Sequence, residues 1–172
     1  EGGMELGNNP QMVGTITSKV RATTKKTIII KLSPNVSRIS DFARIVKEEG
    51  GDAVSAINTL VGTSIDINTR KPKLYNIVGG LSGPAIKPVA LAKVLEIKRN
   101  VDIPIIGIGG IMNWQDAVEF IIAAASAIQV RTANFINPEA SIDILNGMEK
   151  YCTENKIDSI KDLTGSVILD RN

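Results

Sequence analysis

The amino-acid sequence predicts an α/β fold in which the strands of a parallel sheet alternate with helices. Four short apolar runs are rich in β-branched residues and continuous rather than alternating, which is typical of strands buried on both faces of a parallel sheet. The predicted strands are 27–32, 53–58, 104–110 and 127–132. The segments with helical periodicity are 10–20, 39–49, 84–100, 113–125 and 138–155. This alternation indicates βαβ units with right-handed crossovers.

Capping and turn residues set the limits of these elements in order along the chain. The first helix follows two candidate cap residues, Asn8 and Asn9. The first strand leads into turn residues 33–35, and the helix after them ends at a pair of glycines, 50–51. The third helix begins with proline, which the first turn tolerates, and Asn113 caps the fourth. The last helix follows the fourth strand.

One connection, residues 60–81, is longer than the others. It contains two short pieces, 64–68 and 73–76, that predict a small β-hairpin inserted above a strand end. Inserted loops of this kind usually carry function on a rigid scaffold.

Four parallel strands form either a small open sheet or half of a TIM (β/α)8 barrel, which normally needs about 250 residues. Residues of unusual chemistry fall at the carboxyl ends of the strands, where barrel active sites are assembled. A half-barrel alone also leaves two open sheet edges, which favour aggregation. The opening residues do not begin with methionine and have the composition of a loop. We therefore expect residues 1–172 to be the C-terminal part of one barrel domain, about strands five to eight with their helices.

Composition excludes several functional classes. The chain has 20 basic and 18 acidic residues without a strong block of one sign, and only three Phe, two Tyr and one Trp. This balance argues against a nucleic-acid or membrane-surface partner. The absence of histidine removes His-based triads and the commonest zinc sites, and no metal is expected. A single cysteine, no signal peptide and no apolar run of about 20 residues place the protein in the cytoplasm.

Polar side chains at two strand ends are candidates for binding. Lys31 interrupts the most apolar run, where a lysine is costly unless it is paired or used. Three interpretations stay open: a strand end with a snorkelling ammonium, a cation beside an anionic cofactor ring, or a Schiff-base amine. Asn58 and Thr59 close the second strand with donors, an acceptor and a hydroxyl, enough to read a planar polar ligand. Ordinary turn-capping by this pair is the alternative.

Glycines cluster at two further places that precede or follow strands. Residues 79–83 lead directly into a helix, and residues 107–110 close the third strand. Glycine before a helix exposes backbone N–H groups to an anion, although an ordinary tight turn needs glycine equally. Barrel phosphate sites frequently lie between the loops after strands seven and eight. A phosphate is therefore expected between Gly109–Gly110 and Arg131–Thr132.

Four other conspicuous residues are interpreted as structural. Trp114 is expected to pack, and Asp116 and Glu119 are expected to be charges on a helix surface. Cys152 lies in the last helix, far from the strand ends, and is expected to be structural or incidental because a reactive thiol needs an electropositive cleft.

Five sequence strings carry a resemblance to a known family. In chain order they are IIIKLSPNV, AINTLVG, GGLSGPAIKPVAL, IPIIGIGGI and ASAIQVRTANF. They resemble the catalytic subunit of class 1B, NAD-linked dihydroorotate dehydrogenases over nearly the whole chain, and dihydropyrimidine dehydrogenases less closely. The resemblance implies a barrel that binds FMN and oxidises dihydroorotate to orotate in pyrimidine synthesis. It further implies a homo-oligomer and a partner subunit that carries FAD and an iron–sulfur cluster and passes electrons to NAD.

The resemblance also assigns roles to individual residues. Lys31 would contact the flavin ring near its N1/C2 edge, and Thr132 would hold the FMN phosphate through its backbone N–H and hydroxyl. Asn58 and Thr59 would bind the pyrimidine substrate. The residues implied to bind the cofactor are Lys31, Ile57, Gly83, Gly109, Gly110, Arg131 and Thr132.

Three departures from the family pattern limit these expectations. The family's catalytic base is a cysteine in a motif like N-x-S-C-P-N, which is expected upstream of residue 1, so no catalytic residue is assigned and this piece alone is expected to be inactive. Arg131 and Ala124 stand where the family has glycine. A side chain at position 131 threatens close approach of the backbone to the phosphate, so FMN binding is expected to weaken by roughly 1–3 kcal/mol unless the guanidinium compensates.

Two alternatives to a flavoenzyme are kept. One is a Schiff-base barrel of the aldolase kind that uses Lys31 as its nucleophile. The other is a non-catalytic, truncated product that binds phosphate ligands at most. Bound flavin would favour the flavoenzyme, and borohydride trapping of a carbonyl substrate on Lys31 would favour the aldolase.

Overall fold

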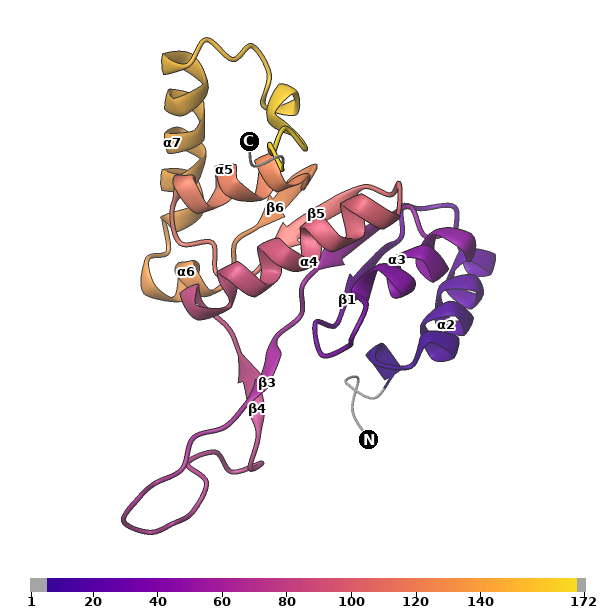
Figure 1. Ribbon diagram of the computed structural model, residues 1–172, viewed down its shortest axis with the longest axis vertical. Helices are drawn as coiled ribbons and strands as arrows, with labels where there is room; N and C mark the ends of the chain where they lie inside the picture. Colours follow the sequence, from indigo (N-terminus) through magenta and orange to yellow (C-terminus); the bar gives the residue numbers. More distant parts are fainter. Residues whose placement is uncertain (1–5, 170–172) are drawn as a thin grey trace.

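The computed structural model describes residues 6–169, and its main element is a four-stranded parallel sheet in the order β1-β2-β5-β6 (Figure 1). A separate antiparallel pair, β3 and β4, projects from the rest. In chain order the elements are α2 (Pro10–Thr23), β1 (Ile29–Leu32), α3 (Ile39–Glu48), β2 (Ala53–Ala56), β3 (Leu60–Gly62), β4 (Gly79–Leu81), the 3₁₀ turn η1 (Pro84–Ile86), α4 (Lys87–Asn100), β5 (Ile105–Ile108), α5 (Trp114–Ala123), β6 (Ala127–Gln129), α6 (Thr132–Ile136), α7 (Ala140–Glu154) and the 3₁₀ turn η2 (Ile160–Leu163).

The predicted alternation of strands and helices is confirmed, with shorter strands. Caps account for the helix starts: Asn9 accepts a hydrogen bond from the Met12 N–H at α2, and Asn113 accepts one from the Asp116 N–H at α5. The fourth predicted strand, 127–132, is wrong in its second half, since Thr132 begins the short helix α6. Residues 1–5, on which the prediction that there is no signal peptide partly rests, lie outside the described residues.

Helices pack against one face of the sheet, and the opposite face is open. Helices α3, α4 and α5 contact the strands, with α2 packed on α3 and α7 on α5. On the helix-covered face Leu32, Val54 and Ile105 are buried. Gly107 lies so close to Phe120 of α5 that a Cβ atom there would come within 2.5 Å of its ring. The other face leaves Ile29 47% exposed, so half of this sheet's surface has no cover within residues 6–169.

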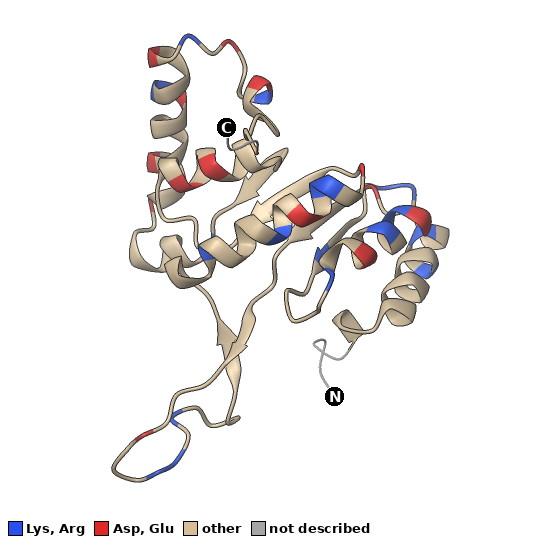
Figure 2. Cartoon of the chain, in the orientation of Figure 1, with Lys and Arg blue, Asp and Glu red and all other residues tan. Residues whose placement is uncertain are grey.

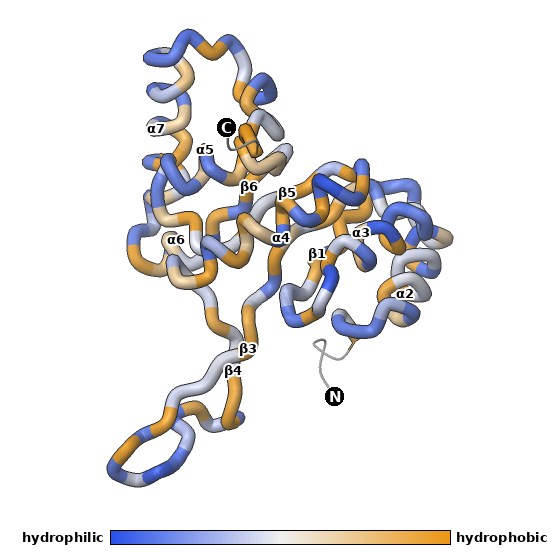
Figure 3. The backbone as a smooth tube through the Cα atoms, viewed as in Figure 1, coloured by the Kyte–Doolittle hydropathy of each residue, from blue (hydrophilic) through white to orange (hydrophobic). Residues whose placement is uncertain are grey.

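Residues 60–81 form an arm that extends away from the sheet (Figure 1). A hairpin was expected here, but its pairing differs from the prediction: Leu60–Gly62 pairs with Gly79–Leu81 at the root. The two pieces predicted to be strands lie nearer the tip and share one isolated bridge, between Ile65 and Pro72. Both apolar and polar stretches lie along the arm (Figure 3).

Charges of both signs are spread over the helices, as the composition predicted (Figure 2). Within residues 6–169 no helix is long and apolar enough to cross a membrane, and no cluster of His, Cys, Asp or Glu side chains is suited to hold a metal ion.

Candidate functional site

A pocket lies at the carboxyl ends of the four parallel strands, on the rim of the open sheet face. All nine residues that the sequence singled out for binding line this pocket. They are Lys31, Ile57, Asn58, Thr59, Gly83, Gly109, Gly110, Arg131 and Thr132. The parallel arrangement causes this, because residues that follow parallel strands meet at the same edge of a sheet.

Lys31 stands on the open face of β1, opposite Ser55 of the neighbouring strand. Its partial loss of solvation, and next the positive charge of Arg131, lower the pKa of Lys31 below its ordinary value. Within the described residues neither cation is paired with an acidic side chain, and the pocket lining contains no Asp or Glu. The pocket is therefore electrostatically suited to an anionic ligand.

The chain segment after β2 carries the candidate binding residues Asn58 and Thr59. Ile57 is buried and donates its N–H to the Ile108 carbonyl oxygen at 2.7 Å, and the Asn58 N–H donates to Leu32 at 2.8 Å. These bonds tie the segment to both neighbouring strands. The Asn58 Oδ1 atom accepts the Thr59 N–H at 2.9 Å, while its amide NH₂ group donates no hydrogen bond to protein among the described residues. That NH₂ group is free for a ligand.

Glycines form another part of the pocket wall. Gly109 and Gly110 have φ values of 135° and 76°, which side chains rarely adopt. A Cβ atom on Gly110 would come within 2.8 Å of the Gly83 carbonyl oxygen and of the Lys87 nitrogen. Both glycine clusters thus meet at one place, and their backbones approach each other too closely for any other residue.

Arg131 and Thr132 close the site at the end of β6. The Thr132 hydroxyl lies 3.4 Å from the Ser82 hydroxyl and hydrogen-bonds to it, so the fourth strand end contacts the loop before η1. Arg131 has φ −127°, a conformation open to any residue, so its side chain causes no backbone strain.

An ion-pair cluster behind the glycine wall was not predicted. The Lys87 Nζ atom donates to Asp116 at 2.6 Å and to Glu119 at 2.9 Å, and the Asp116 carboxylate also accepts the Met112 N–H at 2.9 Å. The hydrogen bond to Asp116, followed by that to Glu119, raises the pKa of Lys87. The expectation of a surface charge at Asp116 is wrong, because this residue is only 7% exposed. The cluster ties the start of α4 to the loop that follows Gly110.

The expectation that Trp114 packs is confirmed. Trp114 packs against Tyr151 of α7 with ring centroids 5.6 Å apart. Cys152 lies on the same helix and does not line the pocket.

Sequence reasoning missed several lining residues. Gln129 accepts a hydrogen bond from the Ser55 hydroxyl at 3.1 Å and so fills part of the open sheet face beside Lys31. Strand alternation carries a signal for it, since Gln129 is two residues before Arg131 and a strand places such residues on one face. The missed lining residues are Ser82, Ile86, Ile108, Ile111 and Gln129.

Comparison with known proteins agrees with this arrangement. The family model described as dihydroorotate dehydrogenase matches residues 1–152. Proteins named dihydroorotate dehydrogenase B (NAD(+)), catalytic subunit, from Desulforamulus reducens and Alkaliphilus metalliredigens are 51% and 49% identical to this chain. The two alignments cover 98% and 96% of the chain but 56% and 55% of those relatives, so the chain spans little more than half their length. The chain belongs to the dihydroorotate dehydrogenase family.

Proposed function

We propose that the full-length protein containing this chain oxidises dihydroorotate to orotate with FMN as its cofactor. The observation that carries the proposal is the shared pocket: every residue to which the family resemblance gives a binding role lines it. The names of the relatives assign them this activity. Because the chain spans 56% of the relative from Desulforamulus reducens, the remainder of the site is assigned to the rest of the catalytic subunit.

The open sheet face supports the proposal that these four strands are part of a (β/α)8 barrel, about strands five to eight. Helices cover only one face, as they do around a barrel. The uncovered face carries Ile29, Ile106 and Ala127, which a barrel interior would bury. The pocket lies at the carboxyl ends of the strands, where barrel enzymes assemble their active sites.

The chemistry of the pocket fits FMN. The Lys31 and Arg131 side chains, which form no ion pair within residues 6–169, supply positive charge for a ligand that carries a phosphate and becomes anionic on reduction. Gly109, Gly110 and Thr132 supply a wall without bulky side chains, where the phosphate is assigned. Lys31 is assigned to the flavin ring.

The chain's own residues then bind substrate and stabilise charge. FMN, when bound, supplies the acceptor for the hydride that leaves the substrate. Asn58 and Thr59 hold the pyrimidine through the free amide NH₂ group and the hydroxyl. The Lys31 ammonium stabilises negative charge that develops beside it. The proton that leaves the neighbouring carbon needs a base; the resemblance assigns it to a cysteine upstream of residue 1, and the chain's own cysteine, Cys152, lies on α7.

The words "catalytic subunit" and "NAD(+)" in the relatives' names support a partner subunit for this protein. We propose that this partner carries FAD and an iron–sulfur cluster and delivers electrons to NAD, and that the catalytic subunit forms a homo-oligomer in the cytoplasm. The mixed surface charge supports neither a nucleic-acid nor a membrane partner (Figure 2).

Substitution of Lys31 tests the assignment. In the full-length catalytic subunit, Lys31→Met is expected to lower kcat/KM for dihydroorotate by about 100-fold or more, since a preorganised charge is lost. Lys150→Met on the exposed surface of α7 is the matched control and is expected to act like wild type. A wild-type protein that binds FMN but does not oxidise dihydroorotate would contradict the proposed reaction.

The lowered pKa of Lys31 also fits a Schiff-base amine, which is the second candidate function. Borohydride treatment with a carbonyl substrate separates the two. Covalent mass added at Lys31 in a flavin-free protein would favour the aldolase chemistry, whereas a yellow protein without that adduct favours the dehydrogenase.

A further inference from the structure

We infer that Asn35 is a positioning residue for the substrate site: its side-chain amide fixes the segment that carries Asn58 and Thr59. Asn35 does not line the pocket, and from its sequence position it is expected only to form part of the turn between β1 and α3. The inference rests on the proposed function, because Asn58 and Thr59 are assigned there to the substrate.

The Asn35 amide uses both of its polar atoms on the same short segment. Its Nδ2 atom donates to the Thr59 carbonyl oxygen at 2.9 Å, and its Oδ1 atom accepts the Val61 N–H at 3.0 Å. This is the hydrogen-bond pattern that a neighbouring strand would offer, supplied by one side chain. Asn35 therefore acts in place of a strand beside the root of the arm.

Ser33 holds the amide in this orientation. Its hydroxyl oxygen accepts the Asn35 backbone N–H at 3.2 Å and the Nδ2 atom at 3.3 Å. Ser33 is buried and follows β1 directly, so the Asn35 amide is attached to the sheet rather than to a free loop. The Asn35 side chain loses little additional conformational entropy when it hydrogen-bonds to residues 59–61, because the turn already restricts it.

The segment has one other attachment on the same side. The Asn58 N–H donates to the Leu32 carbonyl oxygen at 2.8 Å, and beyond it the chain leaves the parallel sheet. On the opposite side Thr59 packs over Gly80 of β4, where a Cβ atom would lie 2.3 Å from the Thr59 hydroxyl oxygen. Thr59 is thus held between Asn35 and Gly80, and loss of either contact displaces Asn58 and Thr59.

The residues to which the phosphate is assigned do not depend on the hydrogen bonds of Asn35. Gly109 and Gly110 follow β5, and Thr132 follows β6, and among the described residues the Asn35 side chain hydrogen-bonds to neither strand. Loss of the amide is therefore expected to weaken substrate binding and to leave FMN binding intact. A general loss of stability would instead lower both.

The experiment compares Asn35→Ala, Asn35→Asp and wild type in the full-length, FMN-loaded catalytic subunit. Orotate is titrated while the flavin absorption spectrum is recorded, and FMN affinity is measured separately by fluorescence. Asn35→Ala is expected to raise the orotate dissociation constant by about tenfold, since small displacements of positioning groups have large effects, and to leave that of FMN within about twofold.

The aspartate variant adds a readout that a purely structural role would not produce. The ionised carboxylate accepts the Val61 N–H but repels the Thr59 carbonyl oxygen, whereas the protonated acid donates to that oxygen as the amide does. Because the repulsion by the Thr59 carbonyl oxygen favours the protonated form, the pKa of this carboxyl is expected above the ordinary value of about 3.9. Asn35→Asp is therefore expected to bind orotate more weakly at pH 8 than at pH 5, with no such difference in Asn35→Ala.

Controls separate the possible failures. Asn100→Ala removes a side-chain hydrogen bond to the Glu96 carbonyl oxygen, at 2.7 Å, far from the pocket lining, and is expected to bind orotate normally. Gly80→Ala displaces Thr59 from the other side and is expected to weaken orotate binding even if Asn35→Ala does not fold. A wild-type protein that binds no orotate contradicts the proposed function itself. Normal orotate affinity in both Asn35→Ala and Gly80→Ala overturns the positioning role while the function stands.

Discussion

Ala124 has a backbone conformation that alanine rarely adopts. It follows α5 with φ 112°, where its N–H donates to the Ile121 carbonyl oxygen at 3.0 Å and ends the helix. Left-handed conformations cost a non-glycine residue roughly 1–2 kcal/mol. Replacing the alanine with glycine loses about 0.8 kcal/mol of methyl burial. We therefore expect Ala124→Gly to raise the free energy of unfolding by up to about 1 kcal/mol, measured by urea denaturation.

Ala123 supplies a matched control for this prediction. It is as buried as Ala124, 5% exposed, but it lies within α5 rather than after it. Ala123→Gly is expected to destabilise the protein by at least about 1 kcal/mol, because glycine is unfavourable inside a helix. If both variants lose stability equally, the strain at Ala124 does not exist.

Arg131 affects both the positive charge in the pocket and how closely the backbone approaches the phosphate. Burial is the larger cause of the lowered pKa of Lys31 and the Arg131 charge the smaller, so Arg131→Gly is expected to raise that pKa in part. The same change has two opposed effects on FMN binding, since it removes the guanidinium charge as well as the Cβ atom; we expect the closer backbone approach to dominate, so that binding tightens by up to roughly 1–3 kcal/mol. NMR titration of the Lys31 side chain and FMN titration measure the two effects.

The variant Arg131→Gln separates these causes. Glutamine removes the charge but keeps the Cβ atom, so it is expected to raise the pKa of Lys31 without any gain in FMN affinity. Unchanged FMN affinity in Arg131→Gly would show that the arginine does not obstruct the cofactor.

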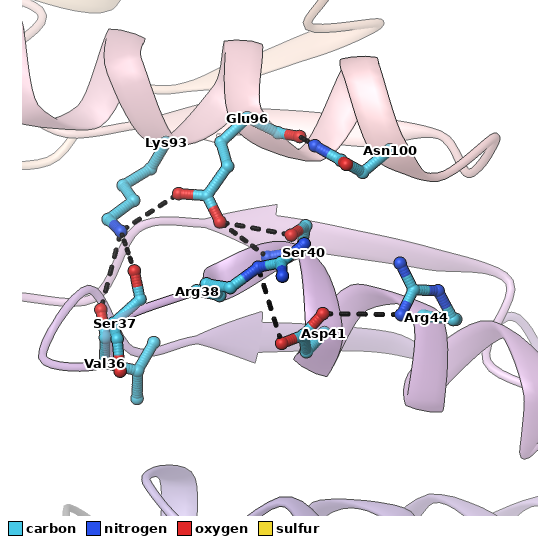
Figure 4. A network of polar contacts seen from close by, with 9 residues as sticks. All are labelled: Val36, Ser37, Arg38, Ser40, Asp41, Arg44, Lys93, Glu96 and Asn100. Carbon is cyan, nitrogen blue, oxygen red and sulfur yellow. Dashed lines mark hydrogen bonds and ion pairs between the residues drawn. The ribbon is translucent and has the colours of Figure 1, made fainter.

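At the scale of elements, helix α3 takes its cap from another helix. Arg38 occupies the N-cap position but makes no capping hydrogen bond with its side chain. The Glu96 carboxylate of α4 accepts the Ser40 N–H at 3.2 Å and its hydroxyl at 3.1 Å (Figure 4). Lys93 donates to Glu96 at 3.1 Å and to the Ser37 carbonyl oxygen at 3.4 Å. A carboxylate at a helix N-terminus is favourable, so this contact fixes α3 against α4.

Glu96→Gln is expected to lower the free energy of unfolding by about 1 kcal/mol at neutral pH, the usual cost of a lost cap. Burial opposes ionisation of Glu96, but the hydrogen bonds from Ser40 and Lys93 outweigh it and lower the pKa of Glu96. The stabilisation is therefore present above the unfolded value of about 4.3 and disappears as the pH falls through the folded value. Urea denaturation at pH 7 and pH 3 measures this.

The control for this prediction is Glu149→Gln on the exposed side of α7, which is expected to leave stability unchanged at both pH values. A difference between wild type and Glu96→Gln that persists undiminished at pH 3 would contradict the electrostatic cap.

The elements that the sequence predicted correctly are those with a local cause. Apolar runs predict the four strands, and Asn9 and Asn113 predict helix starts because their side chains cap backbone groups nearby in the chain. Helix α6 was missed since its five residues are too short for a periodic pattern. The arm was paired in the wrong register because β3 and β4 are held at the root by contacts such as that of Thr59 with Gly80, which only the folded chain brings together.

At the scale of the whole molecule, the candidate site was predictable because the topology of the sheet brings most of its residues together. Once the strands are parallel, residues that follow them converge whatever the details of packing. Lys31 and Arg131, 100 residues apart in sequence, therefore line one pocket. The supporting contacts of Asn35 and Lys87 depend on side-chain geometry between distant segments, which no local pattern encodes.

The arm is the part of the molecule least connected to the rest. Between its paired root strands, residues 63–78 hydrogen-bond mainly to one another, as in the contacts of Asp66 with Lys71 at 2.9 Å and of Lys73 with Ser64 at 2.8 Å. Ile67 is 86% and Tyr75 102% exposed. Exposed apolar side chains on a projecting hairpin indicate an interaction surface. In the proposed homo-oligomer, a second copy of the subunit would contact this surface.

Replacing residues 63–78 by an Asn-Gly turn is expected to leave the melting temperature of the full-length subunit within about 2 °C, since a shift of 1 kcal/mol corresponds to roughly 2–4 °C for a protein of that size. The shortened protein is expected to lose self-association in sedimentation experiments, because the exposed apolar side chains go with the arm. Orotate binding is expected to persist, since the root strands and Thr59 remain. The double substitution Ile67→Ser with Tyr75→Ser keeps the arm's length and is expected to weaken self-association as well. An oligomer that survives both changes would place its interface elsewhere on the molecule.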